Sequence, residues 1–193
     1  MTAAPSVQVF APDIPKAGRI TLAAFALFVI GWLIYIEFTG GLDFNVYRFG
    51  AMTIFDNDGM HKDLYARNLL EYGDFRLPFT YPPFAALALT PLTWGSDRTA
   101  QILLVAATPL CVAATLWALV RRLGAARDVA AGAAPWLALA AVVALEPVPK
   151  TMEYGQINAV LMALVALDLL AVPERSRLRG ALSGLAAAFK LTP

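Results

Sequence analysis

Long apolar runs alternate with short charged segments along this chain. The apolar runs cover about residues 20–38, 99–120, 129–145, 157–172 and 181–193. A helix rises about 1.5 Å per residue, so about 20 apolar residues cross a hydrocarbon core of roughly 30 Å. The pattern predicts an all-α, polytopic integral membrane protein with transmembrane helices at these five ranges. The last range is incomplete, because the chain stops at Pro193 inside it, which indicates the amino-terminal part of a longer protein.

The first apolar run is expected to be an uncleaved transmembrane span. Lys16 and Arg19 precede it, aromatic residues crowd its far end, and no small-residue cleavage site follows it. Interfacial aromatic residues and flanking positive charge are typical of a span and not of a signal peptide. Residues 1–19 are then a cytoplasmic tail, and residues 20–193 belong to one transmembrane domain.

A polar region, residues 39–80, separates the first two apolar runs. The apolar residues within it recur at roughly helical spacing in two groups: Phe44, Tyr47, Ala51 and Phe55, then Leu64, Leu69 and Tyr72. This spacing predicts one or two amphipathic helices that lie in the plane of the membrane surface.

A short helix is expected at about residues 83–92, next to the polar region. Pro83 suits the first turn of a helix, and Pro91 interrupts its interior. Such a helix is only about 15 Å long at 1.5 Å per residue, so we expect it to be in-plane or re-entrant.

Arginine-rich loops set the predicted orientation. Residues 121–127 and 174–179 hold clustered arginines, and Lys16 and Arg19 precede the first span. Short loops rich in Arg and Lys stay in the cytoplasm. The polar region with Asp43, the loop 146–158 and the end of the chain at Lys190 then fall together on the outer face.

Composition supports the membrane assignment and excludes other classes. Hydrophobic residues make up 59% of the chain and charged residues 15%, against roughly 45–50% and 25% in soluble domains. A net charge of +1 leaves no basic face for nucleic acid. The single cysteine, Cys111, excludes an internal disulfide.

Four segments together resemble glycosyltransferase family 87, whose members are membrane enzymes of the GT-C type. The segments are Asp43-Phe44-Asn45-Val46-Tyr47, Phe79-Thr80-Tyr81-Pro82-Pro83-Phe84, Glu146-Pro147-Val148 leading into Gly155-Gln156-Ile157-Asn158, and Gly184 through Lys190-Leu191-Thr192-Pro193. The likeness extends from about Asp43 to Pro193 in the family's order.

The resemblance implies a catalytic GT-C-like helix bundle in a bacterial plasma membrane. Its donor would be a sugar on polyprenyl phosphate, most simply mannose, and its acceptor a glycolipid or lipoglycan. Transfer would occur at the outer face with inversion and without a cofactor. A related arabinofuranosyltransferase is one alternative. A transporter or flippase for lipid-linked sugars is the other.

Asp43 is the expected catalytic residue, and by the resemblance it is the general base. Transfer to an anomeric carbon needs a base within hydrogen-bond reach of the attacking hydroxyl, which contributes roughly 10²- to 10⁴-fold. The alternative is a helix cap after the Gly40-Gly41 turn.

The expected donor-binding residues are polar or aromatic side chains on the same face: Lys190, Gln156, Asn158, Glu146, Tyr81 and Tyr47. A cation inside the membrane costs about 2.5–3.5 kcal/mol unless compensated, so Lys190 is expected to meet the donor phosphate. Each of these residues also has a structural alternative. Lys190 could form a salt bridge or snorkel, and Glu146 could pair with Lys150. Asn158 could cap its helix, and the tyrosines could anchor the chain at the membrane interface.

No metal site is expected. Asp56-Asn57-Asp58-Gly59 has the Asp-x-Asp spacing of some metal sites, but Asp-Gly after Asn is also a common turn. A lipid monophosphate donor does not require a metal. His61, the lone histidine, is interpreted as a solvated loop residue.

Overall fold

The structure is a computed structural model. It describes residues 23, 24, 26–28, 30, 31, 34, 41–54, 63–65, 70–72 and 75–190. The described part is mostly helical, as predicted. Its elements are α2 (Leu42–Met52), β1 (Leu70–Tyr72), β2 (Phe75–Leu77), α3 (Pro83–Ala88), the 3₁₀ helix η1 (Thr90–Thr93), α4 (Asp97–Arg122), α5 (Arg127–Ala144), α6 (Pro147–Tyr154), α7 (Asn158–Leu170) and α8 (Ala181–Phe189).

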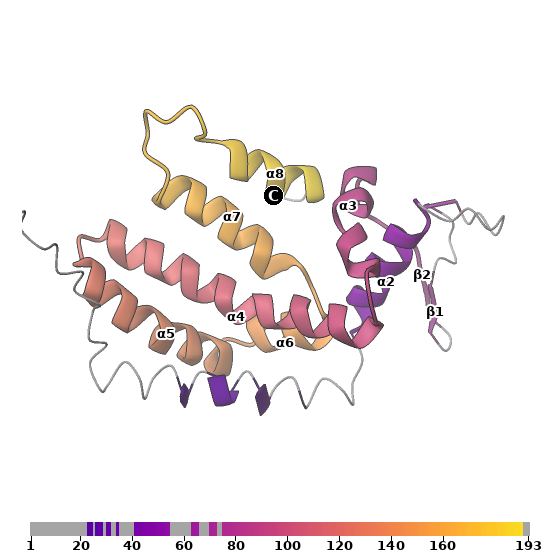
Figure 1. Cartoon of the computed structure of the whole chain (residues 1–193), viewed down its shortest axis with the longest axis horizontal. Coiled ribbons are helices and arrows are strands. Elements are labelled where there is room, and N and C mark those ends of the chain that lie inside the picture. Colours follow the sequence, from indigo (N-terminus) through magenta and orange to yellow (C-terminus); the bar gives the residue numbers. More distant parts are fainter. Residues whose placement is uncertain are drawn as a thin grey trace, which may run out of the picture.

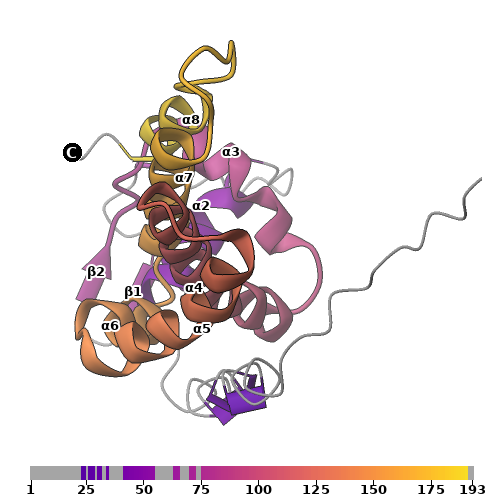
Figure 2. The same cartoon turned by 90° about the vertical axis from the view of Figure 1, so that its left-hand side faces the viewer.

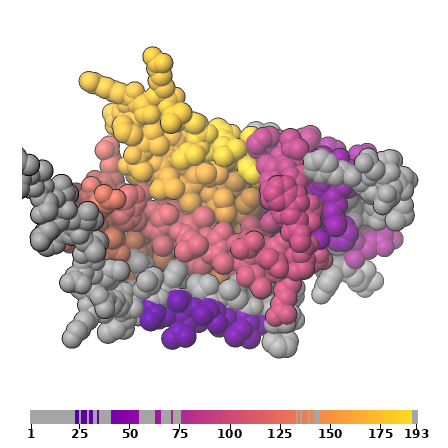
Figure 3. All heavy atoms as spheres, in the orientation of Figure 1, coloured from indigo at the N-terminus to yellow at the C-terminus, as the bar shows by residue number. Residues whose placement is uncertain are grey.

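Helix α4 is the centre of the fold. It packs against α5 on one side and α7 on the other, and α8 packs on the outer side of α7 (Figures 1 and 2). The space-filling view shows α7 and α8 lying along one side of α4, with α8 reaching the α3 region at one end (Figure 3). The elements α2, α3 and the hairpin therefore gather at one end of the helix layers.

The two arginine-rich loops lie at the opposite end. Arg122 Nη2 is 3.5 Å from Glu174 Oε1, which joins the α4–α5 end to the α7–α8 connection. By helical rise, the 26 residues of α4 separate the two ends by about 39 Å. These two loops of the charge pattern thus lie at the end of α4 away from α2, and Lys16 and Arg19 lie outside the described residues.

Local chemistry accounts for the helix ends. The Ser96 hydroxyl accepts a hydrogen bond from the Thr99 N–H and caps α4. At the other end, the positive charge of Arg121 and Arg122 complements the helix dipole. The buried Asp168 carboxylate of α7 accepts hydrogen bonds from the backbone N–H groups of Gly180 and Ser183, each 2.9 Å long, and so caps α8.

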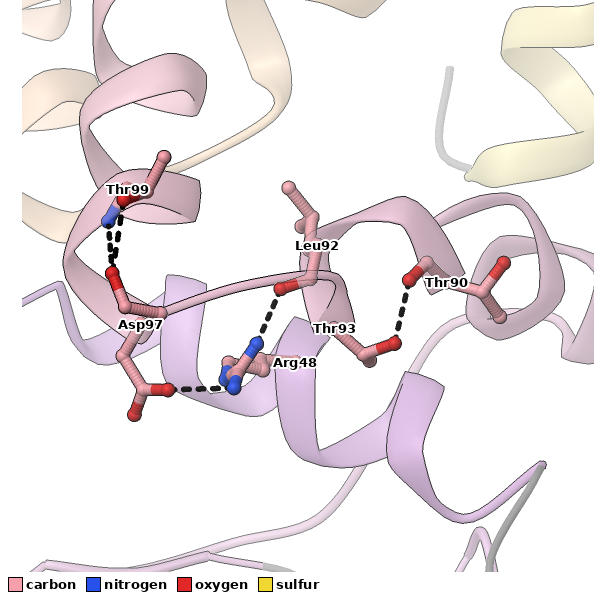
Figure 4. A network of polar contacts seen from close by, with 7 residues as sticks. Arg48, Thr90, Leu92, Thr93, Asp97 and Thr99 are labelled. Carbon is pink, nitrogen blue, oxygen red and sulfur yellow. Dashed lines mark hydrogen bonds and ion pairs between the residues drawn. The ribbon is translucent and has the colours of Figure 1, made fainter.

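Arg48 fastens α2 to the start of α4 (Figure 4). Its guanidinium is buried, with Nη2 2.6 Å from Asp97 Oδ1, and its Nη1 donates to the Leu92 carbonyl of η1. Behind it, Gly50 leaves the space for the buried Phe79 ring, because a Cβ there would lie 2.4 Å from a ring carbon. These contacts hold α2 against η1, against the start of α4 and against Phe79, which lies two residues before Tyr81.

Several predicted elements are found and others differ. Helices occupy the predicted ranges around α4, α5 and α7, and the described residues between 23 and 34 are helical. The predicted helix at 83–92 is instead a six-residue α3 followed by η1, because the chain tightens just before Pro91. The last predicted span ends at Phe189, and the Lys190 backbone is extended.

The amphipathic region contains one of the predicted helices and an unpredicted hairpin. Helix α2 carries Phe44, Tyr47 and Ala51 of the first apolar group, and Phe55 lies outside the described residues. Tyr72 of the second group belongs to β1, which pairs antiparallel with β2. The sequence between the strands is Gly-Asp, a pair favoured in tight hairpin turns.

Length and composition single out α4. Among the described residues, it is the one helix that is both long and apolar enough to cross a membrane, and α7 is a shorter apolar helix. The other membrane crossings stay predictions.

Candidate active site

Two glycines bring the amino terminus of α2 against the turn between α6 and α7. Gly155 ends α6 in the left-handed conformation with φ of 65°, and a Cβ on it would lie 2.8 Å from Phe44 Cβ. The same Cβ position is 3.7 Å from Gly41 Cα. A close approach of two backbones requires residues without side chains. This contact places Asp43, in the first turn of α2, beside Gln156.

Asp43 is held by Gln156. The Gln156 Nε2 donates to Asp43 Oδ2 over 2.5 Å, and both side chains are half-buried. The alternative interpretation, an Asp43 cap on its own helix, is not what the structure shows, because the cap residue of α2 is Gly41 without a side-chain hydrogen bond. The carboxylate instead meets a residue 113 positions away in sequence.

The hydrogen bonds continue from Gln156 to Lys190. The Asn158 Nδ2 donates to Gln156 Oε1 over 2.8 Å, and Lys190 Nζ donates to Asn158 Oδ1 over 3.3 Å. We call Asp43, Gln156, Asn158 and Lys190 the Asp43–Lys190 network. It joins α2, the α6–α7 turn, α7 and the end of α8, so four elements converge on one place.

Lys190 has neutral partners among the described residues. Besides Asn158, its Nζ lies 5.6 Å from the centroid of the Tyr81 ring, a cation–π distance. The end of α8 is held there because Phe189 packs edge-on against Phe84 of α3, with ring centroids 5.5 Å apart. The ammonium has three N–H donors, and its charge has no carboxylate partner in the described structure.

The two predicted tyrosines form a pair next to Lys190. Their hydroxyl oxygens are 3.1 Å apart and their rings meet edge to face at 5.2 Å. The Tyr47 hydroxyl also accepts a weak hydrogen bond from the Ile157 N–H. Burial raises the pKa of both hydroxyls, most strongly for Tyr47, to which the Tyr81 hydrogen bond adds. Both tyrosines are therefore neutral near pH 7 and act as hydrogen-bonding groups.

Glu146 is the one predicted site residue that the structure does not bring to this cluster. It is exposed at the start of α6, whose eight residues separate it by about 12 Å of helical rise from Gln156. The alternative pairing with Lys150 is also wrong, because Lys150 Nζ donates to Glu153 Oε2 over 2.8 Å. That pairing raises the pKa of Lys150.

The expectation of no metal site stays a prediction. Among the described residues, no group of three or more His, Cys, Asp and Glu side chains is arranged to hold a metal ion. Asp56, Asp58 and His61 lie outside the described residues.

An apolar groove begins at the lysine end of the network. It has a volume of about 930 Å³, lies between α7 and α8, and opens to the surface. Its lining residues are Asn158, Leu161, Met162, Val165, Ala166, Leu169, Leu170, Ser183, Ala186, Ala187 and Lys190. Since α7 and α8 are antiparallel neighbours, Asn158 and Lys190 form one end and Leu170 and Ser183 the other. The groove is a feature that sequence reasoning missed.

A signal for the groove exists in the sequence. Leu161, Val165 and Leu169 recur every four residues and so share one face of α7. That pattern alone does not separate a groove wall from a packed core face. Sequence reasoning also missed the Arg48 anchor, because no local pattern relates Arg48 to Leu92 and Asp97.

Comparison with known proteins gives one family and several relatives. Residues 79–193 match the model described as "Glycosyltransferase family 87". The chain is 37% identical to a polyprenol-phosphate-mannose-dependent alpha-(1-2)-phosphatidylinositol mannoside mannosyltransferase of Mycolicibacterium smegmatis, over 85% of the chain and 39% of the relative. It is 32% identical to the protein of the same description from Mycobacterium tuberculosis, over 89% of the chain and 42% of the relative.

A third relative has a different acceptor in its description. It is a polyprenol-phosphate-mannose-dependent alpha-(1-2)-phosphatidylinositol pentamannoside mannosyltransferase of Mycolicibacterium smegmatis, 34% identical over 94% of the chain and 44% of the relative. The chain thus spans about two fifths of the length of these relatives. No solved structure matches it significantly.

Proposed function

Because the chain belongs to glycosyltransferase family 87, we propose that it carries the base and the donor-phosphate site of a polyprenyl-phosphate-mannose-dependent mannosyltransferase. The observation that carries this proposal is the Asp43–Lys190 network, which sets a carboxylate and an ammonium group into one connected site. The acceptor is a glycolipid of the phosphatidylinositol mannoside class, by analogy with the acceptors named for the relatives.

Asp43 is the general base of the proposed reaction. Gln156 occupies Oδ2, and among the described residues it is the one hydrogen-bond donor to this carboxylate. Oδ1 is left to accept the proton of the acceptor hydroxyl while its oxygen attacks the anomeric carbon. The bond from that carbon to the phosphate oxygen breaks, so polyprenyl phosphate leaves with the electron pair. Attack from the side opposite the phosphate inverts the configuration.

Lys190 holds the phosphate of the donor. One of its N–H groups is engaged by Asn158, which leaves two for phosphate oxygens. A cation stabilises the leaving phosphate as its negative charge grows, and such preorganised charge is often the largest single contribution to catalysis. Tyr81 supports the ammonium through its ring face and borders the place where the sugar lies.

The apolar groove between α7 and α8 receives the polyprenyl chain. Its long axis follows the 13 residues of α7, about 20 Å by helical rise. Eight of its eleven lining residues are apolar, and Lys190 stands at one end. A lipid phosphate likewise has a charged head at one end of a long apolar tail. The head therefore meets Lys190 while the tail lies in the groove.

The proposal includes the membrane arrangement. Helix α4 crosses the bilayer, the arginine-rich loops joined by Arg122 and Glu174 face the cytoplasm, and the Asp43–Lys190 network opens to the outer face. The helices around α4 form part of a GT-C-like bundle in a bacterial plasma membrane. The network and the arginine-rich loops lie at opposite ends of the helix layers, which is what an outward-facing site requires.

The test is transfer of labelled mannose by membranes that contain the complete gene product. They are supplied with polyprenyl-phosphate mannose and a phosphatidylinositol mannoside, with Asp43→Asn as the variant. We expect the variant to lose at least 10²-fold in kcat. Asp128→Asn is the matched control, because Asp128 is exposed in the first turn of α5 at the opposite end. Equal transfer by both variants would remove Asp43 from the mechanism, and movement of the lipid-linked sugar without transfer would favour a flippase.

A further inference from the structure

Three hydrogen bonds run from Lys190 to Asp43, and all of them donate in the same direction. Lys190 donates to Asn158, Asn158 donates to Gln156, and Gln156 donates to Asp43. Each amide uses its oxygen on the lysine side and its nitrogen on the aspartate side. A cation therefore stands at one end of the Asp43–Lys190 network and an anion at the other.

The two ends dictate this direction. An ionised carboxylate only accepts hydrogen bonds, so Gln156 must turn its NH₂ toward Asp43 and its oxygen toward Asn158. An ammonium only donates, so Asn158 must turn its oxygen toward Lys190 and its NH₂ toward Gln156. Both requirements give the same orientation of both amides. The assignment thus follows from the chemistry of the ends and does not depend on which amide atom was placed where.

We propose that Gln156 and Asn158 are positioning residues that hold the Asp43 carboxylate in one orientation and link it to the ammonium that meets the donor phosphate. This inference rests on the proposed function and changes the role of both residues, which the sequence predicted as direct donor contacts. Aligned amide dipoles between opposite charges strengthen one another. Within the network each amide already donates one hydrogen bond through its nitrogen and accepts one through its oxygen, so a second N–H group on each remains. Lys190 carries the positive charge that meets the phosphate.

The consequence is a split between kcat and KM. A residue that only orients the base affects the reacting step, and misplacement of a catalytic group by about 1 Å can cost on the order of 10²-fold. A residue that binds the donor in the ground state instead changes KM. The position of Gln156 between Asn158 and Asp43 predicts the first behaviour.

The experiment measures kcat and donor KM for Gln156→Met, Asn158→Leu and the double variant of the complete gene product in detergent. We expect Gln156→Met to lower kcat roughly 10- to 100-fold with donor KM changed less than about twofold. Asn158→Leu should lower kcat in the same direction. The double variant should equal Gln156→Met, because the link is already broken. The proposal would be overturned if the variants raised donor KM and if the effects of the two single variants multiplied in the double variant.

Gln101→Met is the matched control. It makes the same replacement on α4, where Gln101 Nε2 is buried without a hydrogen-bond partner among the described residues. We expect its kcat to stay within about twofold of the wild type, since Met fills a similar volume and no hydrogen bond is lost. If Gln101→Met lost as much kcat as Gln156→Met, the effect would come from the changed side-chain shape near α2 and would contradict the proposed positioning role of Gln156.

A second measurement keeps this inference separate from the proposed function. Absence of mannosyl transfer by the wild type would refute the function, but the hydrogen bond can still be tested by melting temperatures in detergent. The set is wild type, Asp43→Leu, Gln156→Met and the double variant. Losses that do not add show that Asp43 and Gln156 act as a pair. Additive losses would overturn the network as a coupled unit.

Discussion

Gly155→Ala tests the close approach on which the site depends. The substitution places a side chain on a backbone with φ of 65° and a Cβ 2.8 Å from Phe44 Cβ. The left-handed conformation costs about 1–2 kcal/mol for a residue with a Cβ. Overpacking adds about 1–3 kcal/mol, and Phe44 Cβ is attached to the backbone and cannot swing away. Together the expected loss of stability is roughly 2–5 kcal/mol.

The assay separates strain from overlap. Gly124→Ala is the matched control, because Gly124 also follows a helix with positive φ, 93°, but nothing lies within 4 Å of its Cβ position. Gly184→Ala has neither problem and should stabilise α8 by about 0.5–1 kcal/mol. Melting temperatures in detergent should therefore fall in the order Gly184→Ala, wild type, Gly124→Ala, Gly155→Ala.

Activity gives the second readout of the same variants. Moving Phe44 away from residue 155 also moves Asp43 relative to Gln156, so Gly155→Ala should lose kcat below its melting temperature, while Gly124→Ala keeps it. If Gly155→Ala is no less stable than Gly124→Ala and equally active, the contact between α2 and the α6–α7 turn is not what positions the base.

Four further predictions concern the supports of the site. Arg48→Met should destabilise the protein by about 1.5–3 kcal/mol through the lost hydrogen bond from the buried guanidinium to the Leu92 carbonyl, whereas Asp97→Asn should cost under about 1 kcal/mol because Asp97 is exposed; equal melting temperatures would contradict this. Asp168→Ala unpairs two N–H groups at the start of α8 and should lower the melting temperature and raise donor KM. Since burial raises the pKa of Tyr47, the folded state keeps that proton, so stability should fall as pH rises above about 10, less so in Tyr47→Phe, as followed by melting temperature. Ala187→Trp should fill the groove and raise KM for a long-chain donor more than for a short-chain one, with Ala131→Trp on the exposed face of α5 as control.

The helices and the residues that meet in the Asp43–Lys190 network were predicted from the sequence for different reasons. Helix α4 is evident from the long apolar sequence between Ser96 and the arginine pair that ends the helix, a local signal that the fold preserves. Asp43, Gln156 and Lys190 were proposed from the family resemblance and from their position on one predicted face, since no local spacing relates positions that lie 34 to 147 residues apart. Glu146 lies away from the Asp43–Lys190 network, because helix α6 separates it in space from Gln156 although the two residues are close in sequence.

What the sequence could not predict depends on contacts between distant segments. The hairpin is three residues per strand, and its apolar positions also fit helical spacing. Arg48 is polar in sequence but buried in the fold, because Asp97 and the Leu92 carbonyl meet it there. The groove depends on how closely α7 and α8 pack, and small residues such as Ala186 and Ala187 leave the space.

The network also explains why a lysine is tolerated at the end of an apolar helix. Lys190 follows nine mostly apolar residues, where an unpaired cation costs about 2.5–3.5 kcal/mol. Asn158 and the Tyr81 ring compensate part of that cost, and neither carries a full negative charge. The remaining electrostatic demand is for an anion that arrives from outside the described residues. The proposed donor, a phosphate at the head of an apolar chain, would meet that demand and place its chain in the adjoining groove.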